Sequence, residues 1–166
     1  MFKWLKKVYA DPEFKRKEAF LERVRLFNGI HRREYGKLFQ ALVMRDYKAG
    51  EALFSEGEVG RALFILESGD VDVTHNGKDG KPRHVTTLKA GDFFGEIALV
   101  DHLPRIATAT AKGPVRAHLL YKTELEKLAE HSPRVALAIM THSVALLGDR
   151  LRELISRIPA EDGLKG

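Results

Sequence analysis

Glycines divide the middle of this chain into short apolar segments, and this pattern limits the folds that it can adopt. Between residues 44 and 122 the glycines follow one another closely, at Gly50, Gly57, Gly60, Gly69, Gly77, Gly80, Gly91 and Gly95. The segments 62–68, 71–75, 84–88 and 115–121 are short and strand-like in composition, and they predict strands. Many short strands joined by tight turns favour a β-barrel or a β-sandwich.

The segment 75–84 predicts the tip of a hairpin. It contains an Asn-Gly and an Asp-Gly pair between two predicted strands. Such pairs supply the left-handed backbone that tight hairpin turns require. We therefore expect the strands on either side of this segment to pair with each other.

Helical patterns lie on both sides of the β region. Thr123 and Glu126 form a Thr-x-x-Glu pair, which predicts a capping box at the start of a helix. Ser132 followed by Pro133 predicts the start of a longer helix that ends near residue 157. Its apolar residues alternate at spacings of four and three, as in a short heptad seam over 140–158, but a stripe that packs on the core gives the same pattern.

The predicted organisation therefore has a mainly β, α+β character. In chain order it consists of a basic helical leader (1–18), helices with a break at Asn28-Gly29 (19–43), a β block (44–122), closing helices (123–158) and a tail (159–166). The apolar side of the leader is expected to dock on the domain or on a partner. The alternative is contact with a membrane surface.

Composition narrows the classes of function. The 166 residues include no cysteine, which excludes disulfides and thiolate metal sites and favours a reducing, cytoplasmic location. The formal net charge is +5, but residues 1–17 carry +4 of it. Because a DNA-binding surface is more often a basic patch on a folded face, we expect no nucleic-acid partner. Binding of DNA by the leader is kept as an alternative.

The segment 93–111, FFGEIALVDHLPRIATATA, contains two charges that a core segment does not need, Glu96 and Arg105. Gly95 followed by helix formers predicts a short helix whose free N–H groups attract an anion. Arg105 is suited to clamp a phosphate with two hydrogen bonds. Glu96 would repel a phosphate but can accept a hydrogen bond from a hydroxyl. Phosphate beside hydroxyl describes the sugar-phosphate of a nucleotide. The alternative is that Glu96 and Arg105 pair with each other.

The sequences FGEIAL (94–99) and PRIAT (104–108) resemble the phosphate-binding cassette of the cyclic nucleotide-binding domain family. The resemblance extends upstream through LFNGI (26–30), YKAGEALFSEG (47–57) and GRALFILESGDVDV (60–73), and downstream through the two closing helices. It covers roughly residues 20 to 155. It implies an antiparallel, jelly-roll-like β-roll flanked by N-terminal helices and by a C-terminal lid helix.

The resemblance also implies a ligand, cAMP or cGMP, and a set of contacts. Glu96 would bind the ribose 2′-hydroxyl and Arg105 the cyclic phosphate, with backbone N–H groups of Ala98 and Ile106 completing the phosphate site. The implied contact residues are Gly95, Glu96, Ile97, Ala98, Arg105, Ile106 and Ala107. The C-terminal helix would cover the base, and the implied lid contacts are Leu147, Arg150 and Leu151.

One residue departs from the family's pattern. The family carries a small residue after the arginine, and a threonine there favours cGMP, whereas this chain has Ile106. The hydroxyl that would recognise guanine is therefore missing, and we expect cAMP rather than cGMP. The bulk of Ile106 would also crowd the pocket and weaken binding, and the alternative is that it indicates another cyclic nucleotide.

We expect a regulatory module rather than an enzyme. The histidines lack the carboxylates or cysteines of a metal site, and no serine or threonine has an adjacent base, so no catalytic or metal residue is proposed. Family transcription factors continue into a helix-turn-helix, which is not expected here. The output is then an unidentified protein partner, or a homodimer formed through 140–158. The competing hypothesis is a degenerate β-roll that binds no nucleotide and serves as a docking or dimerisation module.

Overall fold

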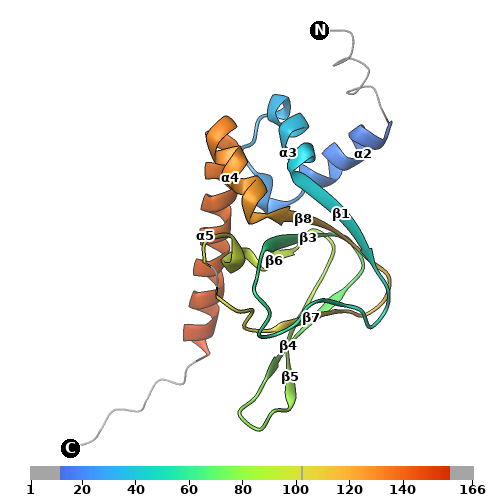
Figure 1. The fold of residues 1–166 in the computed structure, drawn as a ribbon, viewed down its shortest axis with the longest axis vertical. Helices are drawn as coiled ribbons and strands as arrows, with labels where there is room; N and C mark the ends of the chain where they lie inside the picture. Colours follow the sequence, from blue (N-terminus) through green and yellow to red (C-terminus); the bar gives the residue numbers. More distant parts are fainter. Residues whose placement is uncertain (1–11, 102, 158–166) are drawn as a thin grey trace, which may run out of the picture.

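The computed structural model describes residues 12–101 and 103–157, and its helices and sheets are shown in Figure 1. Residues 1–11 of the predicted leader and residues 159–166 of the predicted tail lie outside the described residues. None of the helices in the described ranges is long and apolar enough to cross a membrane.

Eight strands form two antiparallel sheets that face each other. They are β1 (Leu42–Tyr47), β2 (Ala52–Phe54), β3 (Ala62–Ser68), β4 (Val71–Asn76), β5 (Pro82–Leu88), β6 (Phe93–Phe94), β7 (Thr108–Ala111) and β8 (Val115–Tyr121). The first sheet has the order β1-β8-β3-β6 and the second the order β2-β7-β4-β5. A cluster that includes Leu66, Val71 and Ala117 fills the space between them. This arrangement confirms the predicted β-roll with flanking helices.

The predicted hairpin is β4 and β5, which project away from the rest of the roll (Figure 1). His75 pairs with Arg83 across the two strands. In the turn between them, the Gly77 N–H donates to the Lys81 carbonyl at 2.9 Å and the Gly80 N–H donates to the Gly77 carbonyl at 2.8 Å. Gly80 has a φ of +72°, which is the left-handed backbone that the Asp-Gly pair predicts.

Short helices precede the sheets. They are α2 (Pro12–Leu21), the 3₁₀ helices η1 (Arg25–Phe27) and η2 (Arg32–Glu34), and α3 (Tyr35–Ala41). Helical segments lie on both sides of the predicted break at Asn28-Gly29, but the helix expected before it is interrupted after Leu21, and Leu42 already belongs to β1. The chain becomes extended at Val24, with φ −83° and ψ 119°, and Val24, Leu26 and Phe27 are all buried. Burial of these closely spaced apolar residues takes precedence over helical continuity.

Two helices, α4 (Lys122–His131) and α5 (Pro133–Ser156), follow the sheets. The capping box predicted for Thr123 is wrong, because α4 begins at Lys122 and Thr123 lies inside its first turn. Ser132 does occupy the N-cap position of α5 with Pro133 as the first helical residue, but the Ser132 side chain makes no capping hydrogen bond. Fixed backbone geometry at Pro133 is the stronger determinant of this helix start.

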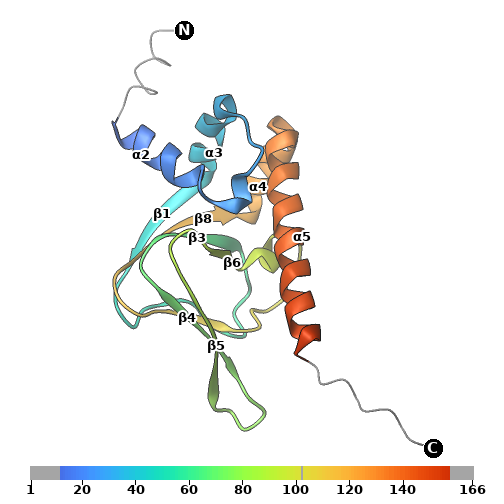
Figure 2. The ribbon, with the colours of Figure 1, turned by 180° about the vertical axis from the view of Figure 1, so that it is seen from behind.

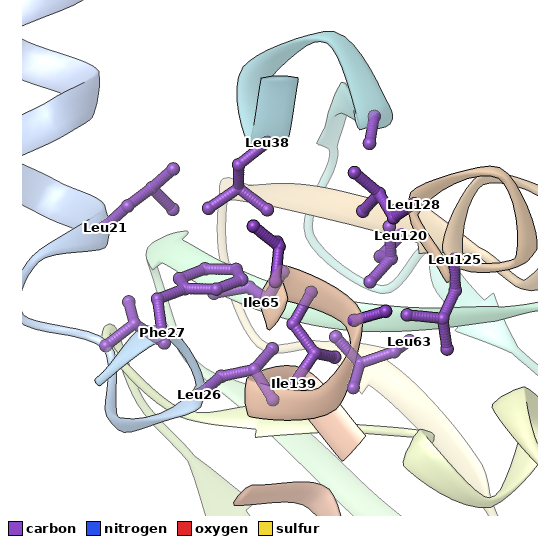
Figure 3. Close-up of a cluster of buried hydrophobic side chains, with 14 of the residues drawn as sticks. Leu21, Leu26, Phe27, Leu38, Leu63, Ile65, Leu120, Leu125, Leu128 and Ile139 are labelled. Carbon is purple, nitrogen blue, oxygen red and sulfur yellow. The ribbon is translucent and has the colours of Figure 1, made fainter. Parts of the chain in front are cut away.

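A second core joins the helices to the outer face of the first sheet (Figure 3). Its labelled members are Leu21, Leu26, Phe27, Leu38, Leu63, Ile65, Leu120, Leu125, Leu128 and Ile139. The buried residues of α5 are Val135, Ala136, Ile139 and Ser143, all in its first half. The second half of α5 continues past this core and runs alongside the β-roll (Figure 2). The core therefore fixes where α5 starts, and other contacts must fix where its second half lies.

The candidate ligand cavity beside α5

A cavity of about 430 Å³ lies between the β-roll and the second half of α5. This volume is in the range of pockets that hold small organic ligands. The β-roll contributes Phe54, Val73, Val85, Thr86, Leu88 and Phe94, and the segment 95–107 contributes the residues around Glu96 and Arg105. The helix α5 contributes Arg150, Glu153 and Leu154, and its C-cap residue Arg157 lines the cavity as well. Segments far apart in the sequence thus meet at one site.

The cavity collects most of the residues that the sequence indicated. All seven residues of the predicted cassette line it, namely Gly95, Glu96, Ile97, Ala98, Arg105, Ile106 and Ala107. Arg150, one of the three predicted lid residues, lines it as well. Leu147 and Leu151 do not, and Leu154 and Arg157 take their place. With 3.6 residues per turn, residues 150 and 154 share one face of α5, the C-cap residue Arg157 follows on the same side, and Leu151 points away from it.

Glu96 is a buried carboxylate with one partnered and one unpartnered oxygen. It opens the 3₁₀ helix η3 (Glu96–Leu99), directly after Gly95, and its exposed fraction is 2%. Arg150 Nη1 donates to Glu96 Oε1 at 2.6 Å. Glu96 Oε2 is buried and has no hydrogen-bond partner among the described residues. A buried acceptor without a donor costs on the order of 1–3 kcal/mol, so the site requires a donor at this oxygen.

Arg105 is held in place by backbone carbonyls and aromatic rings. Its Nη1 donates to the Gly95 carbonyl at 3.0 Å and its Nη2 donates to the Ala62 carbonyl at 2.6 Å. The guanidinium carbon lies 4.2 Å from the ring centre of Phe54 and 5.7 Å from that of Phe64. Burial lowers the pKa of Arg105, and nearby carboxylates oppose this shift, Glu96 most strongly. Arginine keeps its charge at neutral pH in either case.

The predicted alternative, a direct ion pair between Glu96 and Arg105, is wrong for the described structure. Glu96 pairs with Arg150, and Arg105 donates to backbone carbonyls instead. Both charges nevertheless line the same cavity. A guanidinium carries more N–H donors than the two that Arg105 uses here, so it retains donors for a ligand.

Sequence reasoning missed two side chains and one contact that shape this site. Arg150 was indicated as a lid contact, but not as the partner of Glu96, which lies 54 positions earlier. Phe54 and Phe64 form the aromatic support for Arg105 and pack on each other with ring centres 5.4 Å apart. No local motif signals such contacts, because they depend on how the two sheets face each other.

Gly95 and Gly60 leave space for the side chain of Arg105. Gly95 has a φ of +75°, and a Cβ placed there would lie 2.7 Å from Arg105 Nη1. A Cβ at Gly60 would lie 2.6 Å from the Ala98 Cβ and 3.1 Å from the Arg105 Cζ. The close approach at Gly95 is therefore made by the guanidinium. The Ala98 N–H, expected at the phosphate, donates to the Gly95 carbonyl over a long 3.3 Å.

Ile106 lies at the mouth of the cavity instead of filling it. Its exposed fraction is 72%, and Val85, Leu103 and Leu154 are exposed around the same opening. The Ile106 carbonyl accepts a hydrogen bond from His75 Nδ1 at 2.9 Å, which ties this loop to the β4–β5 hairpin. The predicted crowding by Ile106 is thus absent from this structure. The exposed apolar side chains instead give the cavity a mouth suited to a flat aromatic group.

Comparison with known proteins identifies the family of this domain. A family model described as "Cyclic nucleotide-binding domain" matches residues 44–132. The cAMP-dependent protein kinase regulatory subunit of Yarrowia lipolytica is 37% identical over 126 residues, which are 74% of this chain and 33% of that protein. The corresponding subunit of Aspergillus niger is also 37% identical, over 30% of its length. The chain therefore spans about a third of the length of these curated relatives.

Solved structures agree with the fold. The catabolite activator protein of Thermus thermophilus superposes with a TM-score of 0.73 at 28% identity, over 81% of this chain and 61% of that one. The regulatory domain of Toxoplasma gondii PKA, crystallised with cAMP, superposes with a TM-score of 0.66 at 28% identity, over 81% of this chain and 48% of that one. Each superposition covers 81% of this chain, far more than the segment that contains Glu96 and Arg105.

The close approach at Gly95 predicts a specific loss of stability. We expect Gly95→Ala to lower the free energy of unfolding by about 3 kcal/mol, because the methyl group adds a clash with Arg105 to the backbone strain. Gly50→Ala is the matched control, since Gly50 has a φ of +78° and open space where its Cβ would lie. We expect it to cost about 1 kcal/mol from strain alone. Urea denaturation followed by circular dichroism measures both, and equal losses would contradict the role given to Arg105.

Proposed function

The chain belongs to the cyclic nucleotide-binding domain family, and on this premise we propose that the cavity beside α5 binds a cyclic nucleotide, with cAMP preferred over cGMP. One observation carries the proposal. Glu96 and Arg105 line one cavity without binding each other, and Glu96 Oε2 is buried without a hydrogen-bond partner in the part of the chain that the structure describes. An anion beside a hydroxyl group satisfies both residues at once.

The cyclic phosphate is assigned to Arg105. A phosphodiester carries one negative charge, and a fixed guanidinium binds it with charge-assisted hydrogen bonds. Backbone carbonyls and the Phe54 ring already orient Arg105, so little side-chain entropy is lost when the phosphate binds. The Ile106 N–H lies in the same segment and is assigned to the phosphate as well.

The ribose 2′-hydroxyl is assigned to Glu96 Oε2. A hydroxyl can donate a hydrogen bond to this carboxylate oxygen and so remove the cost of burying it unpaired. The ligand class follows from this pair of assignments: a charged phosphate alone would leave Glu96 unsatisfied, and a neutral sugar alone would leave Arg105 without an anion.

The base is assigned to the apolar mouth of the cavity. Val85, Leu103, Ile106 and Leu154 are exposed there, and burial of these side chains against a purine is favourable. Ile106 offers no hydroxyl to a guanine. This supports cAMP over cGMP as the ligand.

The proposed output is regulation through α5 rather than catalysis. Val144, Leu151 and Ile155 are exposed along this helix and do not line the cavity. A protein partner, or a second copy of this chain bound through residues 140–158, would cover them. A ligand that contacts α5 can change this surface only through contacts that differ between the free and bound states. The alternative, a β-roll that binds no nucleotide, is not supported by Ile106, because this side chain leaves the cavity open. Among the described residues Glu96 Oε2 also has no hydrogen-bond donor, which a bound ligand would supply.

The role of Arg105 predicts a large loss of affinity on its removal. We expect wild-type protein to bind cAMP in isothermal titration calorimetry, and Arg105→Ala to bind it about 100-fold more weakly or worse, because charge-assisted bonds are lost. Arg45→Ala is the matched control. The Arg45 guanidinium also lies over an aromatic ring, 4.6 Å from the centre of Tyr47, but is not part of the cavity. Unchanged cAMP affinity in Arg105→Ala would show that the phosphate binds elsewhere.

The preference for cAMP over cGMP is tested at Ile106. We expect Ile106→Thr to raise the affinity for cGMP relative to cAMP about tenfold, since one new hydrogen bond contributes about 1 to 1.5 kcal/mol. Ile106→Val is the control, because valine has the shape of threonine without its hydroxyl. We expect Ile106→Val to leave the ratio of the two affinities unchanged. If both variants shift the ratio equally, the size of the side chain and not its hydroxyl sets the preference.

A further inference from the structure

His75 connects the β4–β5 hairpin to the segment that carries Ile106. Its Nδ1 lies 2.9 Å from the Ile106 carbonyl oxygen and 3.3 Å from Glu56 Oε2. A carbonyl can only accept a hydrogen bond, so His75 Nδ1 carries the proton and donates it. The carboxylate of Glu56 favours the same placement of the proton, because it is an acceptor too. Both side chains lie outside the lining of the cavity.

Glu56 is itself held in place by two hydrogen bonds. Its Oε2 accepts from the Asn76 N–H at 2.8 Å, and its backbone N–H donates to Thr108 Oγ1 at 2.9 Å. The register of β4 and β7 ends where Thr74 pairs with Thr108. His75 and Glu56 therefore extend the contact between the hairpin and the neighbouring chain past the last strand pair, by means of their side chains.

The chain is fixed on both sides of Ile106. The Arg105 N–H donates to the Glu58 carbonyl at 2.7 Å, and the Arg105 carbonyl accepts from the Gly57 N–H at 2.9 Å. The strand β7 begins two residues after Ile106. Between these fixed points, Ile106 makes one hydrogen bond within the described residues, which is the bond from His75. This bond therefore selects the orientation of the Ile106 backbone.

The backbone orientation in turn decides where the Ile106 side chain lies. Isoleucine is β-branched and stiff at χ1, so the direction of its side chain follows the backbone that carries it. Here the side chain is 72% exposed, at the mouth of the cavity. If the same backbone turned toward the roll, the side chain would fill space that is assigned to the ligand. A smaller residue could turn inward without closing the cavity.

We propose that His75, supported by Glu56, is a positioning residue that holds Ile106 outward and so keeps the cavity open for a cyclic nucleotide. This inference rests on the proposed function of the cavity. His75 acts through Ile106 and is assigned no contact of its own with the ligand, because it lies outside the cavity lining. Its effect on binding therefore depends on the size of the side chain at position 106.

A competing role for His75 makes a different prediction. The bond to the Ile106 carbonyl could steady the backbone alone, including the Ile106 N–H that is assigned to the phosphate. Removal of His75 would then weaken binding equally, whether residue 106 is large or small. The dependence on residue 106 thus separates the two roles.

Calorimetric titration with cAMP tests the proposal in a double-mutant cycle. We expect His75→Ala to weaken binding about fivefold in the wild-type background, as the loss of one hydrogen bond allows, but less than about twofold in the Ile106→Ala background. His84→Ala is the control and should leave the affinity unchanged. Both histidines are 56% exposed on the same hairpin, but His84 contacts Asp72 and Thr87 instead. Equal losses in both backgrounds, or no loss in either, would overturn the proposal.

Variants at position 75 separate the hydrogen bond from packing. Asparagine can place an amide N–H close to the position of Nδ1, whereas glutamine places its amide N–H farther out, near the position of Nε2. We expect His75→Asn to recover most of the affinity that is lost in His75→Ala, and His75→Gln to recover little. If both recover it equally, a donor at the Nδ1 position is not what holds Ile106, and the proposal fails.

The tautomer of His75 tests the hydrogen bond without any nucleotide. Proton–nitrogen NMR spectra of the ligand-free protein show which ring nitrogen of the neutral histidine carries the proton. We expect the proton on Nδ1, and a proton on Nε2 would overturn the bond to the Ile106 carbonyl. If the wild type binds no cAMP, the proposed function fails, and the tautomer then decides separately whether His75 holds Ile106.

Discussion

A carboxylate buried to 2% exposure has to be compensated, and the arrangement of this site follows from that requirement at Glu96. Arg150 supplies one donor from α5, which brings the second half of that helix against the roll. The other oxygen is left for a donor from the cavity. Arg105, the second charge of the segment, is excluded from the pair because the Gly95 and Ala62 carbonyls and the Phe54 ring hold it. Because Glu96 and Arg105 do not pair with each other, each still has hydrogen-bonding capacity for a ligand in the cavity.

The two halves of α5 have different physical roles. The first half is packed into the apolar core with the N-terminal helices, through residues such as Ile139 (Figure 3). The second half is held mainly by polar contacts along the cavity, and Leu151 and Ile155 are exposed outside the cavity lining. The cavity therefore borders the half of α5 that lies beyond this core. In the family to which the chain belongs, a regulatory role for such a helix is physically reasonable, because polar contacts are exchanged at less cost than buried apolar ones.

The fold could be predicted from the sequence to a large extent because its signals are local. Glycine spacing indicated the short strands, and Asn-Gly with Asp-Gly indicated the β4–β5 hairpin. The motif around Glu96 and Arg105 gathered seven residues that do line one cavity. The errors have physical causes as well. Thr123 carried a capping signal, but the strand β8 continues to Tyr121 and the helix begins directly after it.

Contacts that depend on tertiary packing could not be predicted in this way. Nothing near Arg150 in the sequence points to Glu96, and Leu147 and Leu151 fit the lid pattern as well as Leu154 does until the rotation of α5 is known. The exposure of Ile106 likewise depends on how its loop is tied to His75, which lies 31 positions away. Helical periodicity predicts which face of a helix is covered only to within a turn. An error of one turn is enough to confuse Leu154, which lines the cavity, with Leu151, which does not.

The central claim is that one ligand satisfies Glu96 and Arg105 together, and a crystal structure of the chain grown with cAMP tests it most directly. The account predicts the cyclic phosphate on Arg105 and the 2′-hydroxyl within hydrogen-bond distance of one Glu96 oxygen, with Arg150 still bound to the other. A nucleotide whose phosphate lies away from Arg105, or whose hydroxyl does not contact Glu96, would contradict it.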